Sequence, residues 1–236
     1  MELYTDLIAV VDLKKGEVEE VDIEEEFIQE NIGGAAANAA LLAEHPGSVV
    51  LGTGILTGTL FPGSAVGVVT AKRNGEICHS AFNWFAGPEL KLSGFSFVIL
   101  EGKAEEPVYL WLHDEIADIE NAETWGKDTW ETTHHLRDEL GENRIQILVI
   151  GEGGEKKSGA ALLINNYWGT DDRNALASVL GEKNVKAVAM RGMGEVEISE
   201  PEEFVSKAEE VLNSLKSKIT RTGAPIQGLD QITQKY

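Results

Sequence analysis

Short apolar runs alternate with polar, glycine-marked breaks along most of the chain, and the spacing inside each run separates strands from helices. Runs rich in β-branched residues predict strands, whereas apolar residues three and four apart predict helices. The predicted strands are residues 48–52, 65–71, 95–101, 107–112, 116–119, 145–150, 159–164 and 185–190. The predicted helices are residues 34–44, 88–92, 129–140, 174–180 and 202–215, with one or two helical turns at 24–31.

Both ends of the chain carry further local signals. Residues 7–23 predict a hairpin, because two β-branched runs flank a turn at Lys14-Lys15-Gly16-Glu17. In the last helix, Ser199 is a candidate N-cap and Pro201 a candidate first residue. The polar tail from Thr220 onward is expected to fray.

The predicted elements form an internal repeat. The order helix, strand, strand, helix, strand over residues 34–103 recurs over residues 129–192, with an offset that drifts from about 97 to about 90 residues. Consecutive strands within each copy favour an α+β fold over a strictly alternating parallel α/β sheet. We therefore predict an α+β duplication whose halves are related by a pseudo-twofold axis. It would fill residues 1–195, followed by a C-terminal helix and polar tail at 196–236.

The densest run of glycines lies in residues 51–104. Eight glycines between positions 52 and 94 punctuate short apolar runs, and no charged residue precedes Lys72 in this stretch. Glycine at such density indicates a backbone that turns often and approaches something closely. Two interpretations stay open at this point: the protein's own core, or a large ligand lying against the backbone.

The net charge of the chain limits which classes of partner it is expected to bind. Forty acidic side chains against twenty Lys and Arg leave a formal net charge of −20. This field opposes nucleic acid and anionic membranes, because binding to phosphates depends on Lys and Arg. The favoured interpretation is that this charge keeps the protein soluble, and the alternative is that it forms a docking surface for a basic partner.

The single cysteine limits the metal and disulfide chemistry of the chain, and the N-terminal segment bears on where in the cell the protein is expected. Cys78 can form no intramolecular disulfide, and this chain alone can ligate neither a cysteine-based zinc site nor a cubane cluster. The first residues lack a basic segment followed by a long apolar run, and no run approaches the ~18 apolar residues that span a bilayer. We expect a cytoplasmic protein.

Short sequence motifs give little evidence for a nucleotide-binding or metal-binding site. The glycines at 52–54 and 151–154 follow strands without the spacing of a nucleotide-binding fingerprint. Cys78, close in sequence to His79 and Glu76, has too few companions for a metal site and is interpreted as a small buried hydrophobe.

Two further groups of side chains are interpreted as structural. The adjacent His134 and His135 point apart on a helix and are expected at the surface. Four tryptophans are candidates for lining a pocket, but large aromatic side chains usually serve the core: Trp84, Trp125, Trp130 and Trp168.

Six motifs follow one another in a fixed order: Leu56-Thr57-Gly58-Thr59, Pro62-Gly63-Ser64, Gly87-Pro88-Glu89-Leu90-Lys91, Glu101-Gly102-Lys103-Ala104-Glu105, Pro107-Val108-Tyr109-Leu110-Trp111 and Trp125-Gly126-Lys127-Asp128-Thr129-Trp130-Glu131. In this order they closely resemble the N-terminal domain of the tungsten-containing aldehyde ferredoxin oxidoreductases. The resemblance implies an α+β duplication that forms a base for a bis-pterin tungsten cofactor. In the family, two further helical domains supply the cubane-cluster cysteines, the substrate channel and the acid/base residues. The chain stops at Lys235-Tyr236, about where those domains would begin, so the resemblance implies the cradle without the rest of the enzyme.

Several positions depart from the family pattern. Ala35 stands where the family has an arginine, residues 65–68 lack a phosphate-contacting arginine, and Ala81 stands where an asparagine helps to hold the bridging magnesium. Each charge-assisted bond is worth about 1.5–3 kcal/mol, so losing two or three predicts weak pterin binding. Bulky residues also replace family glycines at Trp84, Tyr167 and Trp168.

The resemblance leaves six candidate cofactor-binding residues: Asn83, Trp84, Asn165, Asn166, Gly169 and Arg173. Asn83, Asn165, Asn166 and Arg173 would take over the phosphate and magnesium contacts. Gly169 lies near the place of the family's second arginine. No catalytic residue and no protein-ligated metal is expected.

Three functions stay open. The favoured hypothesis is a free-standing cradle that binds no cofactor tightly by itself, is not catalytic alone, and acts as a structural or regulatory subunit. The alternative is the tungstopterin-binding half, or a cofactor carrier, of a split tungsten aldehyde oxidoreductase, holding a tungsten bis-pterin with bridging magnesium. A third is a small-molecule binding module on the Trp84 and Trp168 surface. The expected partner is an oxidoreductase subunit carrying an iron-sulfur cluster, or a second copy of the chain.

Overall fold

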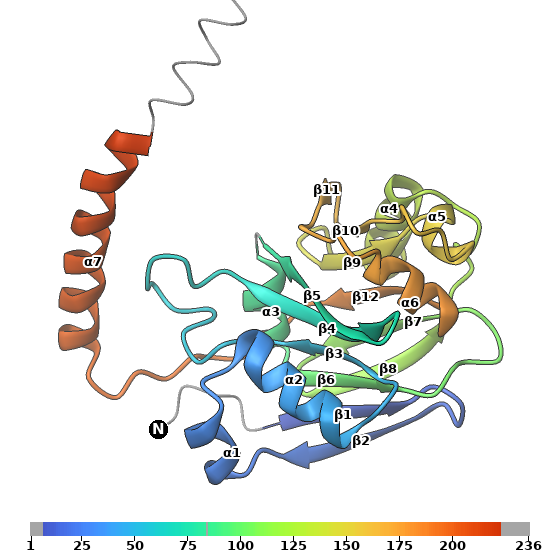
Figure 1. Ribbon diagram of the computed structural model, residues 1–236, viewed down its shortest axis with the longest axis horizontal. Helices are drawn as coiled ribbons and strands as arrows, with labels where there is room; N and C mark the ends of the chain where they lie inside the picture. Colours follow the sequence, from blue (N-terminus) through green and yellow to red (C-terminus); the bar gives the residue numbers. More distant parts are fainter. Residues whose placement is uncertain (1–6, 84, 223–236) are drawn as a thin grey trace, which may run out of the picture. The chain divides into compact units, whose positions relative to one another are not determined.

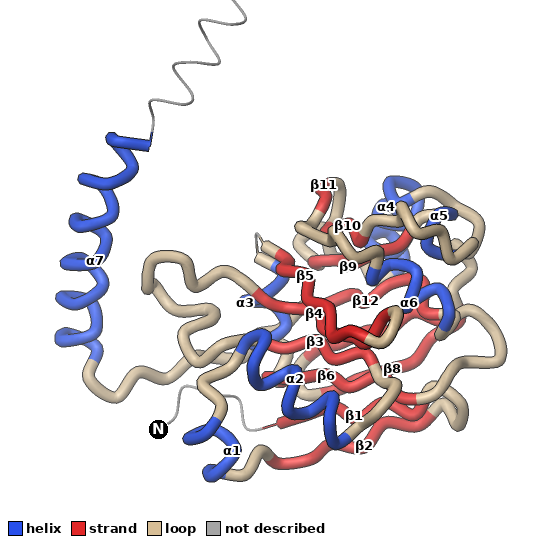
Figure 2. Tube along the Cα trace, in the orientation of Figure 1, coloured by secondary structure: helices blue, strands red, loops and turns tan. Residues whose placement is uncertain are grey.

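The computed structural model describes residues 7–83 and 85–222, with side chains as far as residue 216. The chain divides into two compact units, residues 1–59 with 64–197 and residues 60–63 with 198–236. The larger unit contains two six-stranded sheets (Figures 1 and 2). The smaller unit contains the long helix α7 (Pro201–Thr222), and within it the rings of Phe61 and Phe204 lie 6.2 Å apart. None of the helices in the described ranges is both long and apolar enough to cross a bilayer.

The first sheet is built from the N-terminal hairpin and four further strands. Its order is β2-β1-β6-β3-β4-β5, with β1 and β6 parallel and the other neighbours antiparallel. The Asp12 carboxylate accepts from the backbone N–H groups of Lys14 and Lys15, which fixes the first turn. The elements of this half are β1 (Leu7–Asp12), β2 (Glu17–Asp22), α1 (Glu25–Glu30), α2 (Gly34–Glu44), β3 (Val49–Gly52), β4 (Gly67–Arg73), β5 (Glu76–Phe82), α3 (Ala86–Leu92) and β6 (Phe95–Glu101).

The second sheet repeats the first. Its order, read from the hairpin outward, is β8-β7-β12-β9-β10-β11, again with one parallel pair, β7 with β12. Helix α4 begins at a capping box in which Asp128 and Glu131 bond each other's backbone N–H groups. The elements of this half are β7 (Val108–His113), β8 (Ile116–Asn121), α4 (Thr129–Glu139), β9 (Gln146–Ile150), α5 (Glu152–Glu155), β10 (Leu163–Asn165), β11 (Trp168–Gly169), α6 (Leu176–Glu182) and β12 (Val185–Met190).

The predicted α+β duplication is confirmed, and the repeat is larger than the sequence pattern indicated. Each half includes its own hairpin, β1–β2 or β7–β8, which the repeat over 34–103 and 129–192 leaves out. Both parallel pairs also slip by one residue at the same place, so that Ser96 and Lys186 are skipped in the pairing. A shared irregularity at equivalent positions indicates two copies of one structural unit.

The main core lies between the two sheets, and each sheet has helices on its outer face (Figure 1). Along β6, Val98 and Leu100 point to the inner core, whereas Phe97 and Ile99 point outward to a second cluster under α1 and α2. The outer face of the second sheet packs against Leu136 of α4. Strands buried on both faces explain why the sequence shows continuous apolar runs there.

Three local expectations are wrong. Strand β5 was not predicted, although the Asn74-Gly75 turn before it has the positive φ angles of a hairpin turn. The predicted strand 159–164 is a loop as far as residue 162, with only Leu163–Asn165 in a strand. The last helix, predicted over residues 202–215, is Pro201–Thr222 and so includes the start of the predicted tail; the rest of that tail lies outside the described residues.

The expectations for isolated side chains are met in part. His134 and His135 are exposed, as predicted. Cys78 is half-buried against the main core rather than buried. Trp130 and Trp168 are 57% and 60% exposed, which contradicts their assignment to the core. The Trp130 ring is tilted against the ring of Tyr167, with centroids 4.6 Å apart.

Candidate functional site

The candidate residues gather where the edge of the first sheet meets the β10–β11 hairpin of the second. Asn83 follows β5, and Asn165 is the last residue of β10. The side-chain Nδ2 of Asn165 donates to the backbone carbonyl of Asn83 over 2.7 Å. Two candidate residues from different halves are therefore joined to each other through the backbone of Asn83.

The other polar atom of the Asn165 side chain, Oδ1, is buried and, within the described part of the chain, unsatisfied. Its side chain is 1% exposed, and its Oδ1 has no hydrogen-bond partner among the described residues. A buried acceptor without a donor is costly, so such an atom is often the place where a ligand or water binds. Asn83 itself is exposed.

The segment that follows β11 extends the edge of the first sheet. The Asp171 carboxylate accepts from the backbone N–H of Ala81 and from the hydroxyl of Ser80, the latter over 3.1 Å. In return the Asp171 N–H donates to the Ala81 carbonyl over 3.4 Å. Ala81 is the position where the resemblance places a magnesium-holding asparagine, and here its backbone is bonded to a carboxylate.

Asn166 is fully engaged within its own half. It has a positive φ of 54°, a conformation that asparagine tolerates in turns. Its Oδ1 accepts from the backbone N–H of Ile147 over 3.0 Å and from Arg137 over 3.1 Å, and its Nδ2 donates to Gln146 over 2.8 Å. This side chain closes the hairpin onto β9 and α4, and both its carbonyl oxygen and its amide nitrogen are bonded within the same half.

The remaining candidates are at the surface. Gly169 has open space where a Cβ would stand and no positive φ, so nothing in its surroundings requires glycine. Arg173 is exposed, and the Trp168 ring points to solvent with 60% exposure. Trp84 lies outside the described residues.

Asp172 is a structural residue of this junction that was not predicted from the sequence. Its carboxylate is 2% exposed and accepts four backbone N–H groups, those of Leu163, Asn174, Leu176 and Ala177, over 2.8–3.3 Å. It therefore holds β10 to the start of α6. The acidic pair ahead of a predicted helix was the available signal, since Asp is enriched at helix N-termini.

Some glycines of the glycine-rich stretch are required by the protein's own packing. A Cβ on Gly67 would lie 2.2 Å from the ring of Phe82, and one on Gly87 would lie 2.7 Å from the backbone of Gly67. Helix α3 thus approaches the start of β4 as closely as backbones allow. These two glycines face side chains and backbone of the same half.

A buried lysine lies against the same stretch. Lys91 of α3 donates to the backbone carbonyl of Ile55 over 2.9 Å, and burial lowers its pKa to about 8. In the part of the chain that the structure describes, no three His, Cys, Asp or Glu side chains are gathered as metal ligands. The chemistry available at this junction is hydrogen bonding by Asn165 and charge on Asp171 and Arg173.

Comparison with known proteins finds similarity to the N-terminal part of larger oxidoreductases. Residues 8–192 match the family model described as aldehyde ferredoxin oxidoreductase, N-terminal domain. A tungsten-containing aldehyde ferredoxin oxidoreductase of Pyrococcus abyssi is 32% identical over 226 residues, which are 90% of this chain and 37% of the relative. The aliphatic sulfonate oxidoreductase, WOR-like subunit, of Pyrococcus furiosus is 27% identical and matches 82% of this chain and 35% of its own length.

A solved structure shares the fold. It is a chain of the active site complex BamBC of benzoyl coenzyme A reductase in complex with 1,5-dienoyl-CoA. Its TM-score is 0.86 at 29% identity, covering 92% of this chain and 35% of that one. The chain thus spans a little over a third of the length of the relatives it matches.

Proposed function

Because the chain belongs to the aldehyde ferredoxin oxidoreductase family through its N-terminal domain, we propose that it is a structural or regulatory base within an oxidoreductase assembly and does not by itself hold tungstopterin tightly. One observation carries this proposal. Two polar side-chain groups at the candidate site are used to join the two halves of the domain: the Asn165 amide N–H donates to Asn83, and the Asp171 carboxylate accepts from Ala81. A cradle that bound its cofactor would need such atoms free to face it.

The charge at the junction supports the same proposal. A bis-pterin cofactor carries phosphate groups, which proteins bind with arginine forks, backbone N–H groups and metal ions. Here the consecutive carboxylates of Asp171 and Asp172 take up the nearby backbone N–H groups, and Arg173 is an exposed guanidinium beside them. These residues fit a phosphate-bearing group poorly.

The names of the relatives support a partnership. One is itself called a subunit, and the solved structure is a chain of an active site complex. We propose an oxidoreductase partner that carries the iron-sulfur cluster, since this chain has one cysteine and cannot ligate a cubane alone. In such an assembly the electron-transfer chemistry would belong to the partner.

The second candidate is the tungstopterin-binding half of a split oxidoreductase, and Asn165 favours it. Its buried Oδ1 lacks a donor among the described residues, and the N–H groups of a pterin ring are donors. In this case Asn165 and Arg173 would hold the group, with the exposed Asn83 side chain beside them. When bound, the cofactor would supply the redox chemistry of the metal.

The two candidates are separated by metal and pterin analysis. The chain is produced in a host that makes tungstopterin, grown with tungstate, and purified without added partner. Tungsten and magnesium are measured by mass spectrometry, and pterin by the fluorescence of its oxidised form. The Pyrococcus furiosus aldehyde ferredoxin oxidoreductase, 30% identical over 220 residues, is the loading control in the same host.

We expect the control to carry the cofactor and this chain to carry far less than one equivalent. Stoichiometric tungsten and pterin on this chain would reject the structural proposal in favour of the binding half. In that event an Asn165→Ala variant should lose pterin while keeping its secondary structure. An unchanged pterin content in the variant would place the cofactor elsewhere on the chain.

A further inference from the structure

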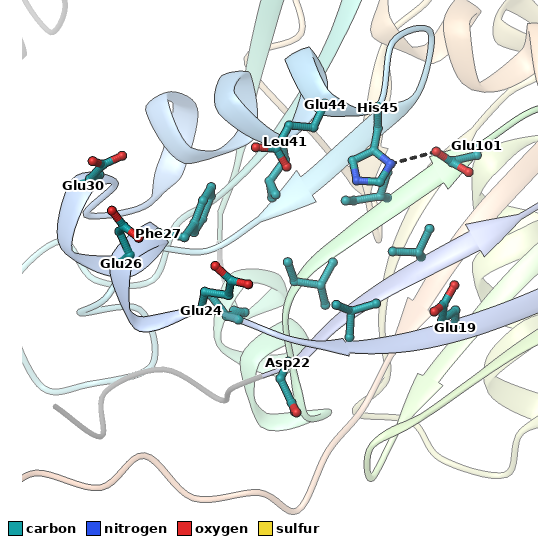
Figure 3. Close-up of a pocket in the computed structure, with 15 residues that line it drawn as sticks. Glu19, Asp22, Glu24, Glu26, Phe27, Glu30, Leu41, Glu44, His45 and Glu101 are labelled. Carbon is teal, nitrogen blue, oxygen red and sulfur yellow. Dashed lines mark hydrogen bonds and ion pairs between the residues drawn. The ribbon is translucent and has the colours of Figure 1, made fainter.

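A groove of about 610 Å³ opens on the outer face of the first sheet, between the β1–β2 hairpin and helices α1 and α2 (Figure 3). Its floor is apolar, with Ile8 and Val10 on β1, Ile99 on β6, and Phe27 and Leu41 on the two helices. Phe27 is held edge-on against Phe97, with ring centroids 6.0 Å apart, so α1 is fixed to the sheet along one side of the groove.

The duplication provides an internal comparison for this floor. Ile8 and Val10 pair with Phe97 and Ile99, whereas Tyr109 and Trp111 occupy the same register positions against Ala187 and Ala189. In the second half, large side chains therefore stand on the strand next to the hairpin. Tyr109 is 2% exposed and reaches Glu139, and Trp111 stacks on His113 with centroids 5.0 Å apart.

In the first half the large side chains stand one strand further from the hairpin, on β6. The hairpin end of the outer face has the smaller side chains of Ile8 and Val10 on β1, with Ile23 just after β2. Ile8 and Ile23 are buried in one cluster with Leu41 of α2, and Val10 is half-buried beside them. The first half therefore has a groove where the second half has Tyr109 and Trp111, and a groove with an apolar floor is a candidate interaction site.

The rim of the groove is acidic. His45 bonds Glu101 over 2.8 Å at one end, and no lysine or arginine is among the described residues that line the groove. Figure 3 shows carboxylates from the hairpin and both helices around the opening. They are Glu19, Asp22, Glu24, Glu26, Glu30 and Glu44.

We propose that this groove docks a basic amphipathic helix of a partner protein. An apolar floor between carboxylates complements a helix with an apolar stripe flanked by Lys and Arg, because the stripe is buried while the cations remain at the charged rim. The groove is on the outer face of the sheet, away from the β5 edge that carries the candidate site. The proposal therefore does not depend on whether tungstopterin binds.

Binding of a fluorescent helical peptide, with Leu at i, i+3, i+4 and i+7 and Lys elsewhere, tests the proposal by anisotropy. Val10→Trp fills the groove with the residue that the second half has at the equivalent position. A second variant, Glu19→Lys/Glu24→Lys/Glu44→Lys, reverses charges on three sides of the rim. The matched control reverses three exposed carboxylates outside the groove, Glu105→Lys/Glu106→Lys/Glu123→Lys, and changes the net charge equally.

We expect Val10→Trp and the rim variant to weaken binding by at least about tenfold, and the control by about twofold or less. Equal loss in the control would assign the binding to the overall charge of −20 and overturn the proposal, as would unchanged binding by Val10→Trp. Circular dichroism checks that each variant is folded, and the rim variant, which changes only surface side chains, decides the matter if Val10→Trp does not fold. Sedimentation that shows a dimer lost in Val10→Trp would make a second copy the occupant and reject a basic helix.

Discussion

The side-chain amide of Asn165 donates to the backbone carbonyl of Asn83, so a buried residue of the second half is tied to an exposed residue of the first. The other side of the same amide, Oδ1, is buried without a partner in the described structure. Leaving a buried acceptor unsatisfied costs about 1–3 kcal/mol, which is comparable to what the one good hydrogen bond contributes. Asn165 therefore orders the junction without adding much stability.

Substitution of Asn165 should show this balance. Asn165→Ala removes the bond and the unsatisfied acceptor together, so we expect the free energy of unfolding to change by about 1 kcal/mol or less. Asn165→Asp keeps the size, loses the donor at neutral pH and buries a charge, and should cost at least about 3 kcal/mol. Urea denaturation at pH 7 measures both.

The pH dependence of the second variant supplies a check. Burial should raise the pKa of the introduced carboxyl above its unfolded value, so its protonated form can donate to Asn83 and the loss of stability should shrink as pH falls. An Asn165→Ala variant less stable than Asn165→Asp at pH 7 would contradict this balance between the hydrogen bond and the unsatisfied acceptor.

Asp172 should contribute far more to the free energy of unfolding than an exposed aspartate does. Its carboxylate accepts four backbone N–H groups and is almost fully buried. We expect Asp172→Ala to lower the free energy of unfolding by about 3–5 kcal/mol, because hydrogen bonds to a charged acceptor are strong and the N–H groups are left unpaired. The exposed Asp138 on α4 is the control, and Asp138→Ala should change stability by about 0.5 kcal/mol or less. Similar losses in both variants would refute this role.

Much of the fold could be predicted because hydrophobic periodicity reports burial directly. The strands at 95–101 and 185–190 were predicted with the bounds that the structure has, since both are buried on two faces and read as continuous apolar runs. Strand β5 lacks such a run; it forms because the Asn74-Gly75 turn folds it back onto β4, a local signal that apolar counting overlooks.

The candidate site could be located but not described from the sequence. Asn83 and Asn165 were chosen as cofactor-binding residues from the family resemblance, and that role stays a prediction; the structure shows that the two residues are hydrogen-bonded to each other. Asn166 was chosen on the same ground, yet its amide is satisfied by Ile147, Arg137 and Gln146. Hydrogen bonds between residues 19 to 29 positions apart are set by tertiary packing, which residue types and spacing do not contain.

The buried pair of Lys186 and Glu155 should be strongly coupled. Lys186 is 0% and Glu155 6% exposed at the side chain; Lys186 also donates to the Lys127 carbonyl over 2.7 Å, and Glu155 accepts from Gly126. Removing one partner leaves a buried charge, so Lys186→Met should cost about 3–5 kcal/mol. The double variant Lys186→Met/Glu155→Gln should be more stable than the sum of the single losses predicts.

An exposed pair in the same region provides the comparison. Lys156 and Glu152 form an ion pair one turn apart with both side chains more than half exposed. Lys156→Met should change the free energy of unfolding by about 0.5 kcal/mol or less, because exposed pairs contribute little. Additive losses in the Lys186 and Glu155 double variant would show that the buried pair is not coupled.

Lys91 should make stability rise with pH above neutrality. Burial lowers its pKa from 10.5 to about 8 in the folded protein, so between these values the unfolded chain holds a proton that the folded protein has released. Deprotonation then favours folding, and the stability of the wild type relative to Lys91→Met should be flat below pH 8 and increase by up to about 2 kcal/mol by pH 10. Tyr109, whose pKa burial raises to about 12, acts in the opposite direction above pH 10 but is common to both proteins. Urea denaturation of the pair at half-unit steps from pH 7 to pH 10 measures the difference, and a difference that stays constant across this range would show that Lys91 is charged in the folded protein throughout.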